Sequence, residues 1–252
     1  RKPLEWRGGR WAVKNLLELK NARRVRIEGN LLENNWAAAQ SGTAILFTPR
    51  NQDGKAPWSE VSDVLFQHNI LRHAVNGITV LATDDIRPSR PTRNIRILHN
   101  LFYDLDGQKW GSGPGGVLLG LNGPGARDIV LAHNTAVHTG ACVVFESNVS
   151  VNGLVIRDNI MGQHILGHGM AGTEALGRFA GSTWQLLRNV IVVGERPDYW
   201  ENRYPADNFY LVSYRQVGFI DPDGGDFQLK PSSRYKGKAT DGKDVGAHLD
   251  AP

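Results

Sequence analysis

The sequence has almost no cysteine and no long apolar run. Its single Cys142 lies in an apolar stretch, which predicts a small buried side chain and excludes an intrachain disulfide. No apolar run approaches the roughly 18 residues that a membrane-spanning helix needs, so we expect no membrane insertion. No basic run alternates with exposed aromatic residues, and we therefore expect no nucleic-acid partner.

Charge of one sign and helical periodicity are missing as well. The 29 basic and 25 acidic residues are interleaved and give a net charge of +4, which is typical of a mixed surface with a mild preference for anionic partners such as uronate polymers. Only residues 15–20 and 173–180 could begin a helical apolar stripe. We expect helices to be local additions at most.

A short phrase recurs instead: a run that alternates apolar and polar residues and ends in asparagine. It ends at Asn30, Asn69, Asn100, Asn134 and Asn159, and more loosely at Asn189. The intervals of 39, 31, 34, 25 and 30 residues are typical of a repeat architecture. A second apolar run follows each of several glycines, so each repeat is predicted to hold at least two short strands.

Two all-β architectures fit such repeats, a propeller and a coil of parallel strands. A propeller blade needs four strands in about 40 residues, whereas one repeat here has only 25 residues. Stacked parallel turns, about 4.8 Å apart, would let each asparagine amide bond to the next one in a ladder. The pattern therefore favours an all-β fold, a coil (solenoid) of parallel strands with an asparagine ladder.

On these residues the chain resembles the pectate-lyase-like superfamily of right-handed parallel β-helices, over roughly residues 14–195. The segment from Gly218 to Ser233, followed by Thr240 to Ala247, resembles the tail of many secreted bacterial β-helix proteins. The resemblance implies coils over residues 1–213, a capping segment over residues 214–252, and an extracellular or cell-surface location. Since residues 4–19 already resemble a coil, we expect the N-terminal part to be truncated. We expect a monomer.

The resemblance also implies a ligand groove along the strand that follows each glycine. By repeat phase, the loops that wall this groove are residues 34–41, 48–60, 83–93, 103–115 and 121–127. Their charged residues and a nearby histidine are the catalytic candidates: Asp84, Asp85, Asp106, Arg50, Lys109 and His73. The carboxylates fit either a glycoside hydrolase or a uronate lyase, and a lyase could need Ca²⁺. Turn formation alone would also explain these aspartates.

Tryptophans in the same loops are candidates for stacking on sugar rings. Together with neighbouring polar residues they make up the predicted substrate-binding set: Trp36, Trp58, Trp110, Asn51, Gln52 and Arg87. A loop tryptophan can instead pack its loop against the core. His68, His99 and His133 share one repeat position, and we expect them to stack as neutral rings and hold no metal.

The function expected from the sequence is the processing of a polysaccharide, possibly an acidic one, by a lyase or a glycoside hydrolase. Two alternatives stay open. The chain could be a non-catalytic carbohydrate-binding module, or a structural module of a larger secreted or surface protein.

Overall fold

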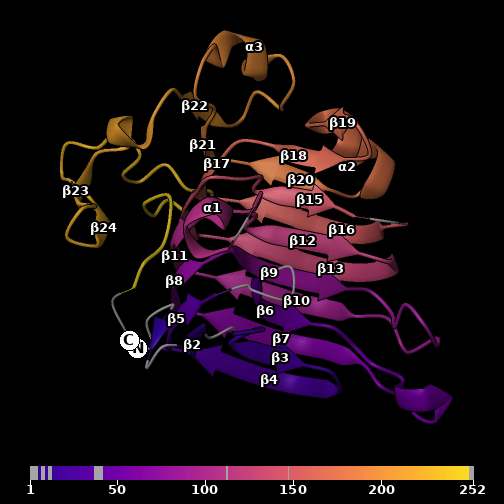
Figure 1. The fold of residues 1–252 in the computed structure, drawn as a ribbon. Coiled ribbons are helices and arrows are strands. Elements are labelled where there is room, and N and C mark those ends of the chain that lie inside the picture. The colour runs from indigo at the N-terminus through magenta and orange to yellow at the C-terminus, as the bar shows by residue number, and fades with distance from the viewer. Residues whose placement is uncertain are drawn as a thin grey trace.

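Successive strands of the chain belong in turn to three parallel sheets (Figure 1). The computed structural model describes residues 13–36, 42–111, 113–146 and 148–249, and the secondary structure alone of residues 5–6 and 9–10. The β7 sheet contains β4 (Ala22–Glu28), β7 (Val61–Gln67), β10 (Arg93–Leu98), β13 (Pro124–Ala132), β16 (Ser150–Arg157) and β20 (Gln185–Leu187). The β8 sheet contains β5 (Leu31–Asn35), β8 (Ile70–Ala74), β11 (Leu101–Leu105), β14 (Thr135–His138), β17 (Ile160–Gly162), β21 (Val190–Val192) and β22 (Phe209–Leu211).

The third parallel sheet carries the strands that follow the glycines. This β9 sheet contains β3 (Leu17–Leu19), β6 (Thr43–Phe47), β9 (Asn76–Leu81), β12 (Leu119–Asn122), β15 (Val143–Phe145) and β18 (Ile165–Gly167), with β19 (Met170–Ala171) antiparallel at its edge. Two further sheets have two antiparallel strands each, β1 (Glu5–Trp6) with β2 (Gly9–Arg10) and β23 (Phe219–Asp221) with β24 (Asp226–Leu229). The helices are η1 (Gln52–Gly54), α1 (Gly107–Trp110), α2 (Thr173–Phe179), α3 (Pro197–Glu201) and η2 (Tyr214–Gln216).

The predicted fold class is corrected by this arrangement. An all-β chain wound as a single β-helix solenoid with a C-terminal cap is wrong as a description of the molecule. The structure is a mixed fold of three parallel sheets side by side, with separate small antiparallel sheets and short helices. The C-terminal residues lie along the flank of the sheets, where Gly246 N–H donates to Asp158 O at 2.9 Å and Ala247 N–H donates to Thr135 Oγ1 at 3.0 Å.

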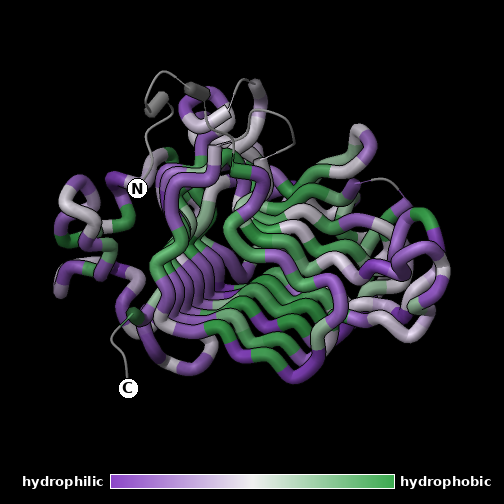
Figure 2. The backbone as a smooth tube through the Cα atoms, turned by 60° about the horizontal axis from the view of Figure 1, so that its bottom comes forward, coloured by the Kyte–Doolittle hydropathy of each residue, from purple (hydrophilic) through white to green (hydrophobic). Residues whose placement is uncertain are grey.

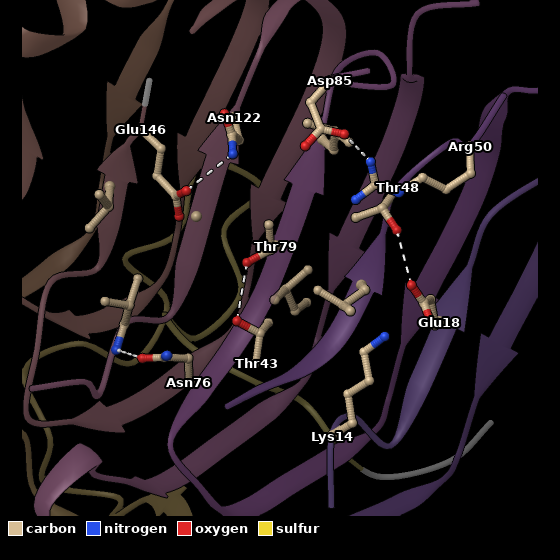
Figure 3. Close-up of a pocket in the computed structure, with 16 residues that line it drawn as sticks. Lys14, Glu18, Thr43, Thr48, Arg50, Asn76, Thr79, Asp85, Asn122 and Glu146 are labelled. Carbon is tan, nitrogen blue, oxygen red and sulfur yellow. Dashed lines mark hydrogen bonds and ion pairs between the residues drawn. The ribbon is translucent and has the colours of Figure 1, made fainter. Parts of the chain in front are cut away.

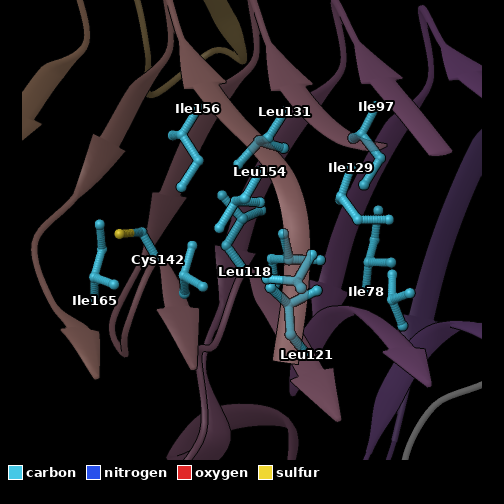
Figure 4. Packing of buried hydrophobic residues seen from close by; sticks show 14 of the residues in the cluster. Ile78, Ile97, Leu118, Leu121, Ile129, Leu131, Cys142, Leu154, Ile156 and Ile165 are labelled. Atoms are coloured by element: carbon cyan, nitrogen blue, oxygen red, sulfur yellow. The ribbon is translucent and has the colours of Figure 1, made fainter. Parts of the chain in front are cut away.

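The core is built by the side chains that alternate inward along the strands. In the β9 sheet, Ile45, Ile78, Leu119, Val143 and Ile165 pair in one continuous row, and each is at most 2% exposed. They share one apolar cluster with residues of the other two parallel sheets (Figure 4). Full burial of one such side chain stabilises the fold by about 1.5–3 kcal/mol, so this packing holds the three sheets together.

A row of asparagines runs along the turns between the β7 and β8 sheets, as the repeats predict. Asn69, for example, donates from Nδ2 to Asn100 Oδ1 at 3.0 Å, and Asn100 donates to Asn134 Oδ1 at 3.0 Å. The row starts at Asn30 and extends beyond the predicted members to Asn208. The residue before most of these asparagines has a positive φ, 53° at His68, His99 and His133. Figure 2 shows this hydrophilic row of stacked turns beside hydrophobic strand segments.

In the described part of the chain, no helix is long and apolar enough to cross a membrane.

Candidate functional site

A polar groove of about 460 Å³ lies over the outer face of the β9 sheet (Figure 3). Strands β3, β6, β9, β12 and β15 form its floor, and the segments that follow β6 and β9 contribute one side. The charged lining residues are Lys14, Glu18, Arg50, Asp85 and Glu146. The uncharged polar lining residues are Thr43, Thr48, Asn76, Thr79 and Asn122.

Strand alternation explains which side chains face the groove. Glu18 pairs with Leu46, Leu46 with Thr79, and Thr79 with Gly120, so the row just beside the buried one points outward. Gly120 leaves a gap in this row. A Cβ at that position would lie 3.1 Å from Glu146 Oε1 and 3.2 Å from Thr79 Oγ1. The missing side chain therefore deepens the floor directly beside the Glu146 carboxyl group.

Glu146 directly follows β15, and its carboxyl group faces the groove. Asn122 on the neighbouring strand donates from Nδ2 to Glu146 Oε2 at 3.2 Å. The side chain reaches solvent through the groove, yet the surrounding walls remove part of its hydration, and this burial raises the pKa of Glu146 above its usual value. A carboxyl group of this kind can hold a proton nearer to neutral pH and deliver it to a ligand.

A second charged group lies on the side of the groove formed by the segments after β6 and β9. Arg50 forms ion pairs with Asp85 and, at 3.4 Å, with Asp84. Asp84 is buried and accepts hydrogen bonds from the amides of Asn51 at 2.6 Å and Ile86 at 3.0 Å. Burial alone would raise the pKa of Asp84, but the amides, together with Asp85 and Arg50, outweigh it and hold the pKa below its usual value. Asp84 therefore fixes the loop, whereas Asp85 faces the groove.

The remaining predicted catalytic residues surround α1, away from the groove lining. Asp106 caps α1 by accepting from the amides of Gln108 and Lys109 at 2.8 and 3.0 Å. Lys109 Nζ lies 2.8 Å from Asp104, and His73 Nε2 lies 3.7 Å from the same carboxylate. The structure thus brings Arg50, Asp84 and Asp85 together but separates them from Asp106, Lys109 and His73.

None of the three predicted tryptophans lines the described groove. Trp36 is buried, with 3% of its surface exposed, and Trp110 stacks on His73 with 4.9 Å between ring centroids. Trp58 is 57% exposed in the loop after η1. Trp36 is covered by the protein and Trp110 is stacked on His73, so of the three predicted tryptophans Trp58 is the one with an exposed ring.

The other predicted substrate-binding residues shape the loops beside the groove. Asn51 is buried, donates to Pro88 O at 2.8 Å and accepts from Ala56 N–H at 2.7 Å, which ties two loops together. Gln52 donates to the neighbouring Asp53 at 3.0 Å. The Arg87 side chain passes within 3.6 Å of the position that a Cβ on Gly54 would take. These contacts join parts of the loops to one another.

Sequence reasoning missed Glu18, Thr79 and Glu146 because they lie in or directly after strands, and it did not select Asn122 although this residue lies in the predicted wall loop 121–127. The signal that could have found them is alternation within the strands. In Leu17–Leu19 and in the run from Val143 to Glu146, acidic residues break otherwise apolar segments at positions that alternate outward. Residues 37–41 of the first predicted wall loop lie outside the described residues.

The comparisons with known proteins identify no relative. No family model matches the chain, no curated protein matches it, and no solved structure matches it. The resemblance to the pectate-lyase-like superfamily therefore stays a prediction.

Proposed function

We propose that the chain is a glycoside hydrolase that binds a polysaccharide along the groove over the β9 sheet. The observation that carries the proposal is Glu146, a carboxyl group with a raised pKa that faces the groove beside the gap at Gly120. Hydrolysis of a glycosidic bond needs such a group to protonate the leaving oxygen. Glu146 is the proposed general acid.

A second carboxylate is proposed to activate water. Asp85 follows β9, which only β12 separates from β15, so these strands are about 10 Å apart at the usual strand spacing. Arg50 would position Asp85 through their ion pair.

The polar lining supports a sugar ligand of low charge. Hydroxyl and amide groups of Thr79, Thr48 and Asn122 are suited to hydrogen bonds with sugar hydroxyls. Among the charged lining residues, three are acidic and two are basic, which disfavours a strongly anionic uronate. Because intact polysaccharides do not enter cells freely, we also propose that the protein acts outside the cell or at its surface.

The test is incubation of the full chain with a panel of neutral and acidic polysaccharides, with calcium or with a chelator. We expect new reducing ends without ultraviolet absorbance from unsaturated uronates, and we expect Glu146→Gln to abolish them. Glu174→Gln, an exposed acidic residue on α2, is the matched control. Ultraviolet absorbance would instead indicate a lyase, and saccharide affinity without either product would indicate a binding module.

A further inference from the structure

Three histidines from distant parts of the chain meet on the flank of the molecule. His99 follows β10, His133 follows β13, and His248 comes from the C-terminal segment. One ring nitrogen of each lies within 4.8 Å of the corresponding nitrogens of the other two. The ring centroids of His99 and His133 are 4.8 Å apart, and that of His248 lies 5.3 Å from His99 and 5.6 Å from His133.

Three ring nitrogens of this histidine cluster, from His99 and His133, lack the hydrogen-bond partners that buried polar atoms require. His133 is 4% exposed, and neither its Nδ1 nor its Nε2 has a hydrogen-bond partner. His99 Nδ1 is likewise buried without a partner. Buried polar side-chain atoms in folded proteins are almost always satisfied, so nitrogens that converge without partners indicate a ligand between them.

The surroundings of the cluster suit a metal ion. His248 Nε2 lies 2.9 Å from Asp244 O; when this nitrogen carries the proton, Nδ1 keeps its lone pair for coordination. Two carboxylates are close to His133 Nε2, with Asp241 Oδ2 at 3.4 Å and Asp158 Oδ2 at 3.5 Å. Imidazole nitrogens with a nearby carboxylate are the ligands preferred by Zn²⁺ and related divalent ions.

We propose that His99, His133 and His248 bind one divalent transition-metal ion of the zinc class, with Asp241 as the nearest carboxylate for a fourth position. Nitrogens that share a zinc ion stand about 3.3 Å apart, so the rings must approach one another by up to about 1.5 Å. The ion would join the C-terminal segment to two adjacent turns of the sheets.

The sequence did not reveal this site, because it showed only the column of His68, His99 and His133. His68 is not one of the three converging residues; its Nδ1 lies 2.9 Å from the backbone oxygen of His248. The decisive third ligand lies 115 residues beyond His133 in the sequence. The cluster also lies at the turns between the β7 and β8 sheets, whereas the groove covers the β9 sheet, so the proposal is independent of the hydrolase function.

The test is titration of the full chain, prepared without a polyhistidine tag, with Zn²⁺ by calorimetry and with Co²⁺ by visible absorption. We expect one ion per chain and the ligand-field bands of four-coordinate cobalt. His248→Ala is expected to weaken binding at least tenfold, and so is His99→Gln, which leaves the C-terminal segment unchanged. His168→Ala, an exposed histidine outside the cluster, is the control and should retain full affinity.

A second measurement separates a site from general weakening of the fold. Zn²⁺ should protect residues 214–249 of the unmodified chain from limited proteolysis and should give no protection in His99→Gln. Absence of saturable binding would overturn the proposal. Equal affinity in His99→Gln and the unmodified chain, or weak binding of several ions, would overturn it too.

Discussion

At the scale of single residues, His138 shows how one neutral side chain joins neighbouring segments. Its Nδ1 lies 3.0 Å from Gly116 O, and its Nε2 accepts from Gly162 N–H at 3.0 Å. Nδ1 must therefore carry the ring proton, and a second proton on Nε2 would break the bond to Gly162. Burial lowers the pKa of His138 to about 4.

We predict that the protein loses stability as the pH falls below about 6.5. Because the pKa of His138 is lower in the folded chain than in the unfolded chain, the unfolded chain takes up the proton first, and acid favours unfolding. Between pH 7 and pH 5 this residue alone should reduce the free energy of unfolding by about 2 kcal/mol. His99, whose pKa burial lowers to about 3, acts in the same direction.

Urea denaturation at the two pH values measures this effect. His138→Gln retains a hydrogen-bonding side chain but does not titrate, so its free energy of unfolding should depend less on pH. A urea midpoint of the unmodified chain that stays constant from pH 7 to pH 5 would contradict the prediction.

Glu146 should affect stability in the opposite sense from an ordinary paired carboxylate. Because burial raises its pKa, its favourable contribution is present at low pH and is lost as the pH rises through the folded pKa. Glu146 reaches solvent, so at pH 7 its ionised form adds no stability to the fold. We predict that Glu146→Gln has a melting temperature at pH 7 no lower than that of the unmodified chain, and a clear decrease measured by calorimetry would argue against this environment.

At the scale of structural elements, the asparagine row joins successive turns through buried hydrogen bonds. Asn134 is fully buried; its Oδ1 accepts from the backbone and side-chain nitrogens of Asn100 at 2.9 and 3.0 Å. Its Nδ2 donates to Ile97 O at 2.9 Å and to Ala132 O at 3.0 Å. Removing this amide leaves several buried polar groups without partners.

We predict that Asn134→Ala lowers the free energy of unfolding by about 3 kcal/mol or more, since each orphaned buried group costs about 1–3 kcal/mol. Asn30→Ala is the matched control, because Asn30 occupies the exposed end of the same row and water can replace its bonds. Chemical denaturation of both variants provides the comparison. Equal losses would show that the buried network adds no stability.

The C-terminal segment is fastened to the sheets through Asp158. This carboxylate is fully buried and accepts from Thr240 N–H at 2.7 Å, from Thr240 Oγ1 at 2.6 Å and from Arg157 Nη1 at 2.6 Å. Further along the chain, Tyr235 is fully buried in a second apolar cluster, separate from the one that joins the three parallel sheets. The Asp158 contacts, the hydrogen bonds of Gly246 and Ala247 to the sheets and an apolar cluster thus hold a segment that has little regular structure of its own.

We predict that Asp158→Ala lowers stability by about 3 kcal/mol, because it removes the buried acceptor of the Thr240 amide and hydroxyl and of the partly exposed Arg157 guanidinium. Residues 214–249 should become more sensitive to limited proteolysis, read by mass spectrometry. The exposed Asp223→Ala serves as control. Unchanged proteolysis of this segment in Asp158→Ala would show that other contacts fasten it.

Strands were easier to predict from the sequence than helices or the C-terminal segment. The alternating runs predicted the strands and the asparagine row, because both depend on local periodicity and on repeated residues. The helices α1 and α3 escaped prediction, since they have only four and five residues, too few for an apolar stripe, whereas α2 lies within the run 173–180 that could begin one. The path of the C-terminal segment could not be predicted, because it depends on contacts such as that between Thr240 and Asp158, 82 residues apart.

At the scale of the whole molecule, the parallel sheets carry two separate chemical surfaces. The groove lies over the β9 sheet, and the histidine cluster lies at the turns between the β7 and β8 sheets. The sequence located the strands that bear the groove but selected loop residues, of which Arg50 and Asp85 line it. Asp106, Lys109 and His73 were separated from them because repeat phase does not determine the direction in which a loop folds.

The most direct test of the proposed function compares polysaccharide hydrolysis by the unmodified chain, Glu146→Gln and Glu174→Gln on the same substrate. The account predicts reducing ends from the unmodified chain and from Glu174→Gln. For Glu146→Gln it predicts a rate lower by about 10²–10⁴, the usual contribution of a general acid. A rate that Glu146→Gln leaves unchanged would contradict the assignment of the groove as the active site.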